Sequence, residues 1–138
     1  WRYVSWARRC VSETAIARSA AALRAMADHS DGVMPELDYV NPETGADVLP
    51  TMGFTAMMLA AGLKTTPPRR SCSSAFHVVA GRGRTTIDGQ TVGWGPKDTF
   101  SAPVFASLSH EADEEAFLVR IHDRPLQEKL GYYEERDS

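Results

Sequence analysis

The sequence predicts an all-β protein: a jelly-roll barrel of antiparallel strands, with one helix before the barrel and a short helix after it. Short apolar runs recur at regular spacing from residue 36 onward, and turn-forming residues separate them. Over residues 12–28, apolar residues recur at helical spacing instead. We therefore divide the chain into an N-terminal arm and linker helix, residues 1–35, and a barrel with its C-terminal tail, residues 36–138.

The N-terminal helix is predicted over residues 12–28. Ser12 is of a type that caps helices, and Glu13 suits the positive end of the helix dipole. One face carries the apolar residues Ile16, Ala20, Leu23 and Ala27. Because this stripe is narrow and rich in alanine, we expect it to pack closely on the outside of the barrel or on another subunit.

The two ends of the chain carry weaker signals. Residues 1–11 mix aromatic side chains with arginines, and a short arm that packs Trp1, Tyr3 and Trp6 against a partner surface is one interpretation. Residues 125–131 begin with proline and end with glycine, which predicts a short helix. The charged and aromatic residues 132–137 are expected to be solvated or to face a partner.

Strands of the barrel are predicted where apolar residues lie between turn-forming residues. The strongest local signal is Asp88-Gly89, a two-residue hairpin turn. Residues 54–61 are good helix formers, but the short length of this segment and its flanking glycines favour a buried strand. The predicted strands are residues 37–40, 54–61, 75–80, 84–87, 90–94, 99–102 and 117–121.

Composition excludes several classes of function. With 138 residues, 43% apolar residues and a net charge of -3, the chain is typical of one globular domain, with no reason to expect nucleic acid or a membrane as a partner. Cys10 and Cys72 match no metal or redox spacing, and we expect reduced thiols in a cytoplasmic protein. Because the chain opens on Trp1, we expect it to be a piece of something longer.

Residues 62–112 keep the spacing of the two sequence signatures of cupin barrels. The first signature is a glycine, five residues, His-x-His, a short gap, an acid and a glycine, and it corresponds to Gly62 through Gly81. The second runs from a glycine through a proline to a last histidine, and it corresponds to Lys97 through Pro103 to position 108. The four ligand positions hold Pro68, Arg70, Ser74 and Leu108. This chain therefore resembles a cupin, or double-stranded β-helix, barrel with its metal ligands replaced.

The residues at the four ligand positions lack the donor groups that an iron site requires. A redox iron in such a barrel needs three or four imidazole or carboxylate donors that converge on one point. Proline and leucine side chains offer no lone pair, and a guanidinium is permanently charged. We therefore expect no metal at the usual cupin position. The vacated centre is expected to be lined mainly by the apolar residues Pro68, Leu108, Phe76 and Val78.

A more specific resemblance covers about residues 36–133. Residues 39–45 read Tyr-Val-Asn-Pro-Glu-Thr-Gly, residues 49–53 read Leu-Pro-Thr-Met-Gly, and residues 75–81 read Ala-Phe-His-Val-Val-Ala-Gly. Gly83-Arg84-Thr85 and Ile87-Asp88-Gly89 follow. In these stretches the chain resembles the C-terminal half of gentisate 1,2-dioxygenases, a family that includes salicylate and 1-hydroxy-2-naphthoate ring-cleaving dioxygenases.

The resemblance implies a place in a larger enzyme. Such proteins are bicupins whose Fe(II), held by three histidines, lies in the N-terminal barrel, so this chain would be the other barrel. The resemblance implies no cofactor in this chain and no catalysis by it alone. Its partners would be the N-terminal cupin domain of the same protein and further copies in a homo-oligomer.

Two residues are weak candidates for ligand binding. Arg70 and His110 are both expected to point into the barrel, where a guanidinium and an imidazole at one mouth would hold a carboxylate or phosphate. The alternative is that Arg70 reaches out to water and that His110 bonds a nearby carboxylate such as Glu111. His77 is one residue out of phase with its apolar neighbours and is expected to point outward. We assign no role to His29 and His122.

Three hypotheses follow. The favoured one is a metal-free C-terminal cupin domain that supports the iron-bearing half of a dioxygenase and packs against other subunits. The second is a stand-alone binding module for a small anion, built on Arg70 and His110. The third is an active metalloenzyme with ligands from unexpected positions.

Overall fold

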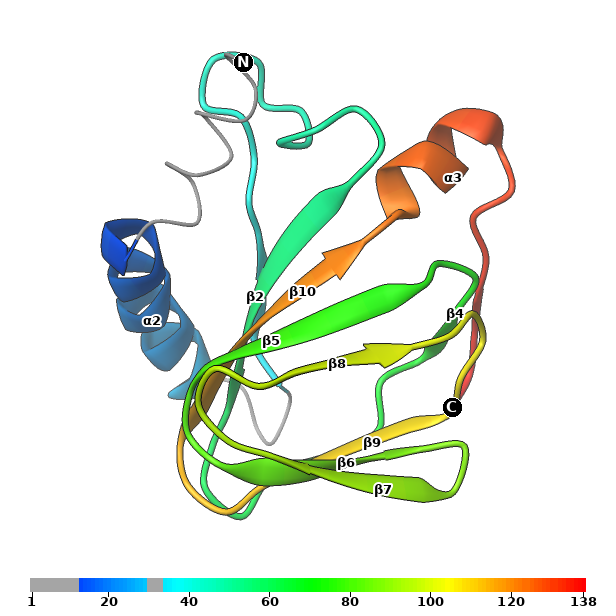
Figure 1. The fold of residues 1–138 in the computed structure, drawn as a ribbon. Helices are drawn as coiled ribbons and strands as arrows, with labels where there is room; N and C mark the ends of the chain where they lie inside the picture. Colours follow the sequence, from blue (N-terminus) through cyan, green and yellow to red (C-terminus); the bar gives the residue numbers. More distant parts are fainter. Residues whose placement is uncertain (1–12, 30–33) are drawn as a thin grey trace.

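A computed structural model describes residues 13–29 and 34–138 and contains two antiparallel sheets that face each other (Figure 1). The larger sheet has the order β1-β2-β10-β5-β8, and the smaller has the order β3-β9-β6-β7. A third, two-stranded ribbon pairs β11 with β4. The larger sheet consists of β1 (Glu36–Asp38), β2 (Gly53–Leu59), β10 (Ala116–His122), β5 (Ser74–Ala80) and β8 (Thr99–Ala102). The others are β3 (Lys64–Thr65), β9 (Leu108–Ala112), β6 (Gly83–Ile87), β7 (Gln90–Trp94), β4 (Arg69–Arg70) and β11 (Glu135–Arg136).

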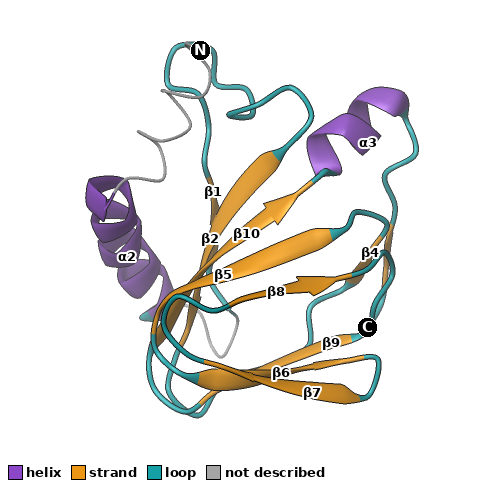
Figure 2. Cartoon of the chain, viewed as in Figure 1, coloured by secondary structure: helices purple, strands orange, loops and turns teal. Residues whose placement is uncertain are grey.

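The predicted all-β fold with two helices is confirmed. Helix α2 (Glu13–Ala27) lies against the outer face of the larger sheet, where its Leu23 is buried with Ala56, Met58 and Phe117 (Figures 1 and 2). The predicted cap residue Ser12 and the aromatic arm, residues 1–11, lie outside the described residues. Helix α3 (Arg124–Leu130) ends at Gly131, which has a left-handed φ of 76°, as its C-terminal glycine predicted.

The predicted strands form, with bounds shifted by one or two residues in several cases. Residues 41–45 form the predicted turn, and only a single bridge joins Val40 to Asp47, so β1 ends at Asp38. Asp88 and Gly89 have φ of 48° and 86°, as the predicted hairpin turn between β6 and β7 requires. Lys97, at the place of a signature glycine, also has a positive φ of 75°. The backbone at this position therefore has the left-handed conformation that favours glycine, although the residue is a lysine.

Four strands were not among those predicted. They are β3, β4, β9 and β11, and each is short or carries polar residues. In β9 the run Leu-Ser-His-Glu-Ala becomes a strand through pairing with β6 along its whole length. The tail was expected to be solvated or to face a partner, and residues 134–137 are exposed, while Glu135 and Arg136 also pair with Arg70 and Arg69. The tail therefore covers one end of the barrel in this chain.

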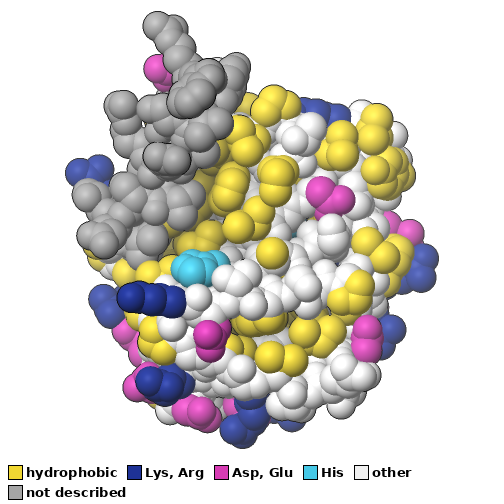
Figure 3. Space-filling model, in the orientation of Figure 1, with side chains coloured by type: hydrophobic (Ala, Val, Ile, Leu, Met, Phe, Trp, Pro, Cys, Tyr) yellow, Lys and Arg dark blue, Asp and Glu magenta, His cyan; other side chains and the backbone are white. Residues whose placement is uncertain are grey.

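The core lies between the two sheets. Residues on alternate positions of each strand point inward because strand side chains have a period of two. Phe76 and Phe100 stack with ring centroids 5.0 Å apart, and Trp94 stacks on Phe100. The buried members of this cluster include Met57, Leu59, Phe76, Val78, Trp94 and Leu118. On the outside, hydrophobic side chains gather on the upper part of the face seen in Figure 3, and charged residues lie mainly around its lower margin.

Candidate functional site

The four predicted ligand positions converge on one cavity at an end of the barrel. Pro68, Arg70, Ser74 and Leu108 come from β4 and the loop before it, from β5 and from β9, and all four side chains line the same space. The cavity measures about 20 Å³, room for roughly one water molecule. Its other lining residues are Cys72, Phe76, Ala102, Pro103, Ala106 and Arg120. The four positions that the signature spacing grouped together thus lie around one cavity.

The residues around this cavity do not fit a catalytic iron. Pro68 and Leu108 offer no donor atom, and Ser74 offers only a neutral hydroxyl. Arg70 and Arg120 add two positive charges, which oppose the binding of a divalent cation. Within residues 13–29 and 34–138, no group of three or more His, Cys, Asp or Glu side chains is placed to hold a metal ion.

Arg120 is the main site residue that sequence reasoning missed. It lies in β10 opposite Phe76 and is 2% exposed. Its Nη2 lies 3.4 Å from Glu36 Oε2 and 3.4 Å from Thr55 Oγ1. Its Nε has no hydrogen-bond partner in the described part of the chain. Burial lowers the pKa of Arg120 from its ordinary value, and the nearby Arg70 lowers it further.

A signal for Arg120 was present in the sequence. The residues of β10 on alternate positions are Ala116, Leu118, Arg120 and His122, and all four are buried. In a strand of period two, an arginine in phase with Leu118 must point the same way as that leucine. The general preference of arginine for the surface argued against this placement.

Arg70 lines the cavity and is held by two carboxylates. Its Nε donates to Glu135 Oε1 at 3.0 Å, and its Nη2 lies 3.7 Å from Glu36 Oε2. Burial by itself would lower the pKa of Arg70, but Glu36 and Glu135 raise it overall. The side chain is 16% exposed, so the alternative that it reaches out to water does not describe this structure. Glu36 contacts both guanidinium groups and ties β1 to β4 and β10.

His110 points inward as predicted, but it does not line the cavity with Arg70. It is fully buried, and its ring meets the edge of Phe76 at a centroid distance of 5.3 Å. Its Nδ1 lies 2.9 Å from the Thr85 hydroxyl, which also accepts a hydrogen bond from Trp94 Nε1. The suggested partner Glu111 is wrong, because that carboxylate accepts from Arg84 on the surface. Phe76 therefore separates the two residues that the sequence grouped together.

Burial also sets the charge of His110. Burial, followed by the positive charges of Arg120 and Arg70, lowers the pKa of His110 to about 4. The imidazole is therefore neutral at neutral pH. Its Nδ1 contacts the Thr85 hydroxyl, and its buried Nε2 has no hydrogen-bond partner in the described part of the chain.

A second buried histidine, His122, lies two residues after Arg120 in β10. His122 Nε2 is 3.0 Å from Thr55 Oγ1, and that hydroxyl donates to Asp38 Oδ1 at 2.5 Å. Burial, then Arg120 and Arg124, lowers the pKa of His122 to about 4. No role for His122 was predicted, because its partners Thr55 and Asp38 are far away along the chain.

The other histidines and Ser71 lie away from the cavity. His77 is exposed as predicted, and its Nδ1 lies 2.9 Å from Thr99 Oγ1 on β8. His29 is exposed just after helix α2. Ser71 donates to Gln127 Oε1 at 2.6 Å, which joins β4's end to helix α3. None of these described contacts pairs a serine with a histidine.

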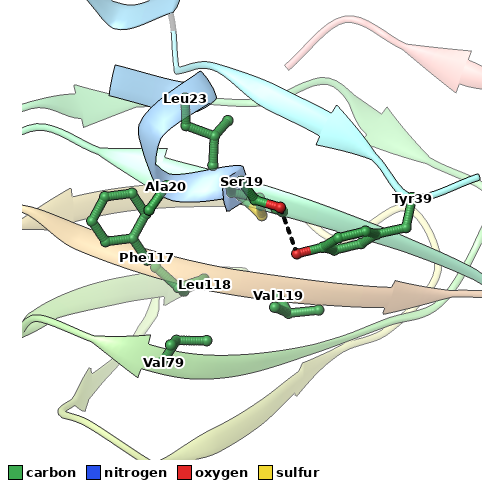
Figure 4. A pocket seen from close by; sticks show the side chains of 10 residues that line it. Ser19, Ala20, Leu23, Tyr39, Val79, Phe117, Leu118 and Val119 are labelled. Atoms are coloured by element: carbon green, nitrogen blue, oxygen red, sulfur yellow. Dashed lines mark hydrogen bonds between the residues drawn. The ribbon is translucent and has the colours of Figure 1, made fainter. Parts of the chain in front are cut away.

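A further small cavity lies between helix α2 and the outer face of the larger sheet (Figure 4). Ser19 Oγ donates to Tyr39 Oη at 2.9 Å across one side of it. Leu23 and Ala20 of the helix face Phe117, Val119 and Val79 of the sheet. The cavity measures about 10 Å³ and is lined mainly by apolar side chains. It is a packing gap under the helix.

A jelly-roll barrel whose strands bring these signature positions to one centre is a cupin domain, and the comparisons with known proteins agree. The gentisate 1,2-dioxygenase of a Ralstonia species is 35% identical over 120 residues, which cover 85% of this chain and 34% of that protein. Gentisate 1,2 dioxygenase 1 of Aquipseudomonas alcaligenes is 33% identical over 100 residues, 72% of this chain and 29% of that protein. The chain is thus a cupin domain homologous to a segment of the gentisate 1,2-dioxygenases.

Solved structures give the same result. The salicylate 1,2-dioxygenase of Pseudaminobacter salicylatoxidans superposes with a TM-score of 0.82 at 26% identity, over 91% of this chain and 38% of that one. The chain therefore spans about a third of the length of the relatives it matches. No protein-family model matches the chain. Among the described residues, neither helix has the length and apolar character needed to cross a bilayer.

Proposed function

We propose that this chain is the metal-free C-terminal cupin domain of a gentisate 1,2-dioxygenase-like, Fe(II)-dependent ring-cleaving enzyme of the cytoplasm. In this proposal residues 1–35 form the arm and linker, and the domain supports an iron-bearing N-terminal barrel and the packing of subunits. The observation that carries the proposal is the cavity. All four cupin ligand positions line it, and none of them holds an imidazole or a carboxylate.

The charged contacts around the cavity support a structural role. Glu36, the first residue of the barrel, lies within 3.4 Å of Arg120 and 3.7 Å of Arg70. Glu135 of the tail holds Arg70 from the other side. Through these ion pairs, the arginines beside the cavity connect β1, which follows the linker, with the C-terminal tail. In this proposal, ion pairs hold the strands together at the position where a catalytic cupin has metal–ligand bonds.

The first prediction tests the lack of metal. After incubation with ferrous iron without oxygen and removal of free metal, the purified chain is expected to retain less than about 0.1 iron per chain, because no donor set is present. It is also expected to open the ring of gentisate no faster than free iron does. Elemental analysis and the absorbance of the ring-opened product are the measurements.

A matched variant makes this test sharper. In P68H/R70H/S74E/L108H, the usual donors are returned to the four positions, so this variant is expected to retain more iron than the natural chain. Stoichiometric iron in the natural chain, with turnover that a chelator abolishes, would contradict the proposed metal-free role.

The second prediction concerns assembly. Among the described strands, β8 ends the larger sheet and β7 ends the smaller sheet, and each pairs on one side only, so these edges could pair with another chain. Tyr132 in the tail is 54% exposed. We expect a dimer or larger species at micromolar concentration in sedimentation velocity, with a lower association constant when residues 1–11 are removed or Tyr132 is replaced by serine. A monomer at every concentration would argue against a role in assembly.

A further inference from the structure

We propose that the former metal centre of this domain is an anion site, in which Arg120 and Arg70 hold a small monoanion, either a halide or the carboxylate of a one-carbon acid. The inference goes beyond the supporting role proposed above and does not depend on it. It also differs from the sequence-based grouping of Arg70 with His110, because Phe76 lies between His110 and the cavity.

The first support is the makeup of the cavity wall. Arg70 and Arg120 line the cavity, and its other lining residues in the described chain are neutral. Phe76, Ala102, Ala106, Pro103 and Leu108 form an apolar wall around the charges. In such a setting an anion is attracted to a guanidinium more strongly than in water.

The second support is the hydrogen-bond state of Arg120. Its side chain is 3% exposed, and its Nε has no partner in the described part of the chain. A buried guanidinium N–H without an acceptor is costly, so an acceptor in the cavity is favoured. The two contacts that Arg120 does make, to Glu36 and Thr55, are both long at 3.4 Å. This arginine therefore keeps unused capacity to donate to an acceptor in the cavity.

The two arginines face two carboxylates, so an anion would be held by the donor groups of the cavity and not by a net positive charge. Glu36 is shared between Arg70 and Arg120, and Glu135 contacts Arg70, but neither carboxylate lines the cavity. Asp38 is held by Arg124 and by the Thr55 hydroxyl. Burial raises the pKa of the Cys72 thiol, so the thiol that lines the cavity is neutral. Its S–H and the Ser74 hydroxyl supply further donors for an anion.

The small volume of the cavity limits the size of the anion that could bind. A space of about 20 Å³ does not hold an aromatic acid or a phosphate ester. Chloride is a single atom and formate is the smallest carboxylate, so these two anions would displace the half-buried lining residues Pro68 and Leu108 least. The site therefore differs in ligand class from one that binds an aromatic substrate.

The test is a titration followed by nuclear magnetic resonance of arginine side chains. The 138-residue chain, labelled with nitrogen-15, is titrated separately with sodium formate and sodium chloride, while sodium gluconate keeps the ionic strength constant. The Nε–H signal of Arg120, assigned through its own backbone resonances in the natural chain, is expected to move and to saturate with one or both salts. Saturation by formate alone identifies a carboxylate site, and saturation by chloride identifies a halide site.

Three variants complete the experiment. Arg120→Met is expected to weaken binding at least about tenfold, because it removes a charge-assisted donor. Ala106→Val narrows the cavity, keeps both arginines and is expected to weaken binding as well, so it decides the question if Arg120→Met does not fold. Arg84→Met removes an exposed arginine on the smaller sheet and is expected to bind like the natural chain. No saturable shift with either salt, or equal binding by Ala106→Val, would overturn the inference.

Discussion

Replacing Gly81 with alanine is expected to lower the free energy of unfolding by at least about 3 kcal/mol, because two costs act together. Gly81 has a φ of 91°, which side chains rarely adopt. An added Cβ would also lie 2.5 Å from the Cα of Ala116 and 2.6 Å from the carbonyl oxygen of Glu115. These are backbone atoms at the start of β10, so they cannot turn aside as the end of a flexible side chain can. Urea denaturation followed by circular dichroism measures the effect.

Two other glycines separate the two costs. Gly89 has a similar φ of 86° but no atom within 4 Å of an added Cβ, so Gly89→Ala is expected to cost only about 1–2 kcal/mol for the left-handed backbone. Gly93 has open space and no positive φ, so Gly93→Ala is expected to change stability by less than about 0.5 kcal/mol. Equal losses for Gly81→Ala and Gly89→Ala would show that the contact with β10 is not tight.

The second large effect is expected on acidification. His110 and His122 have pKa values lowered from 6.5 to about 4 in the folded chain. Between about pH 6.5 and 4 the unfolded chain takes up protons on these histidines and the folded chain does not, so stability falls as the pH falls. Each histidine contributes roughly 1–3 kcal/mol to this loss. Above about pH 6.5 both states are neutral at these residues and the contribution is complete.

Denaturation at a series of pH values measures this dependence. His110→Leu is expected to flatten the slope of unfolding free energy against pH between about 4 and 6.5, because it removes one group that the unfolded state protonates. His77→Gln changes an exposed histidine on the outer face and serves as the control for the substitution. An unchanged slope in His110→Leu would mean that His110 takes up its proton in the folded state as readily as in the unfolded one.

An anion in the cavity is also expected to change how stability depends on pH. Both histidines lie near Arg120, whose charge contributes to the lowered pKa of each. An anion beside Arg120 would reduce the net positive charge that each imidazole meets. Formate or chloride is therefore expected to lessen the loss of stability at low pH, in proportion to its occupancy of the cavity.

The sequence by itself determined the features that depend on near neighbours. Asp88-Gly89 makes a two-residue turn because its backbone preferences are local, and Gly131 ends helix α3 for the same reason. The spacing of the signatures placed Pro68, Arg70, Ser74 and Leu108 around one centre, because fixed strand and turn lengths carry these positions to the same end of the barrel. The grouping of these four residues could therefore be predicted before the structure.

Only the tertiary structure decided which polar residues share the barrel interior. His110 is inward as its phase predicted, yet Phe76 from another strand separates it from Arg70. Arg120 reaches the cavity because β10 lies between β2 and β5 in the middle of the larger sheet, and its partner Glu36 comes from a strand 84 residues earlier. Strands β9 and β11 form only when β6 and β4 are there to pair with them. Such pairings join residues far apart in the chain, so local patterns of turns and periodicity do not predict them.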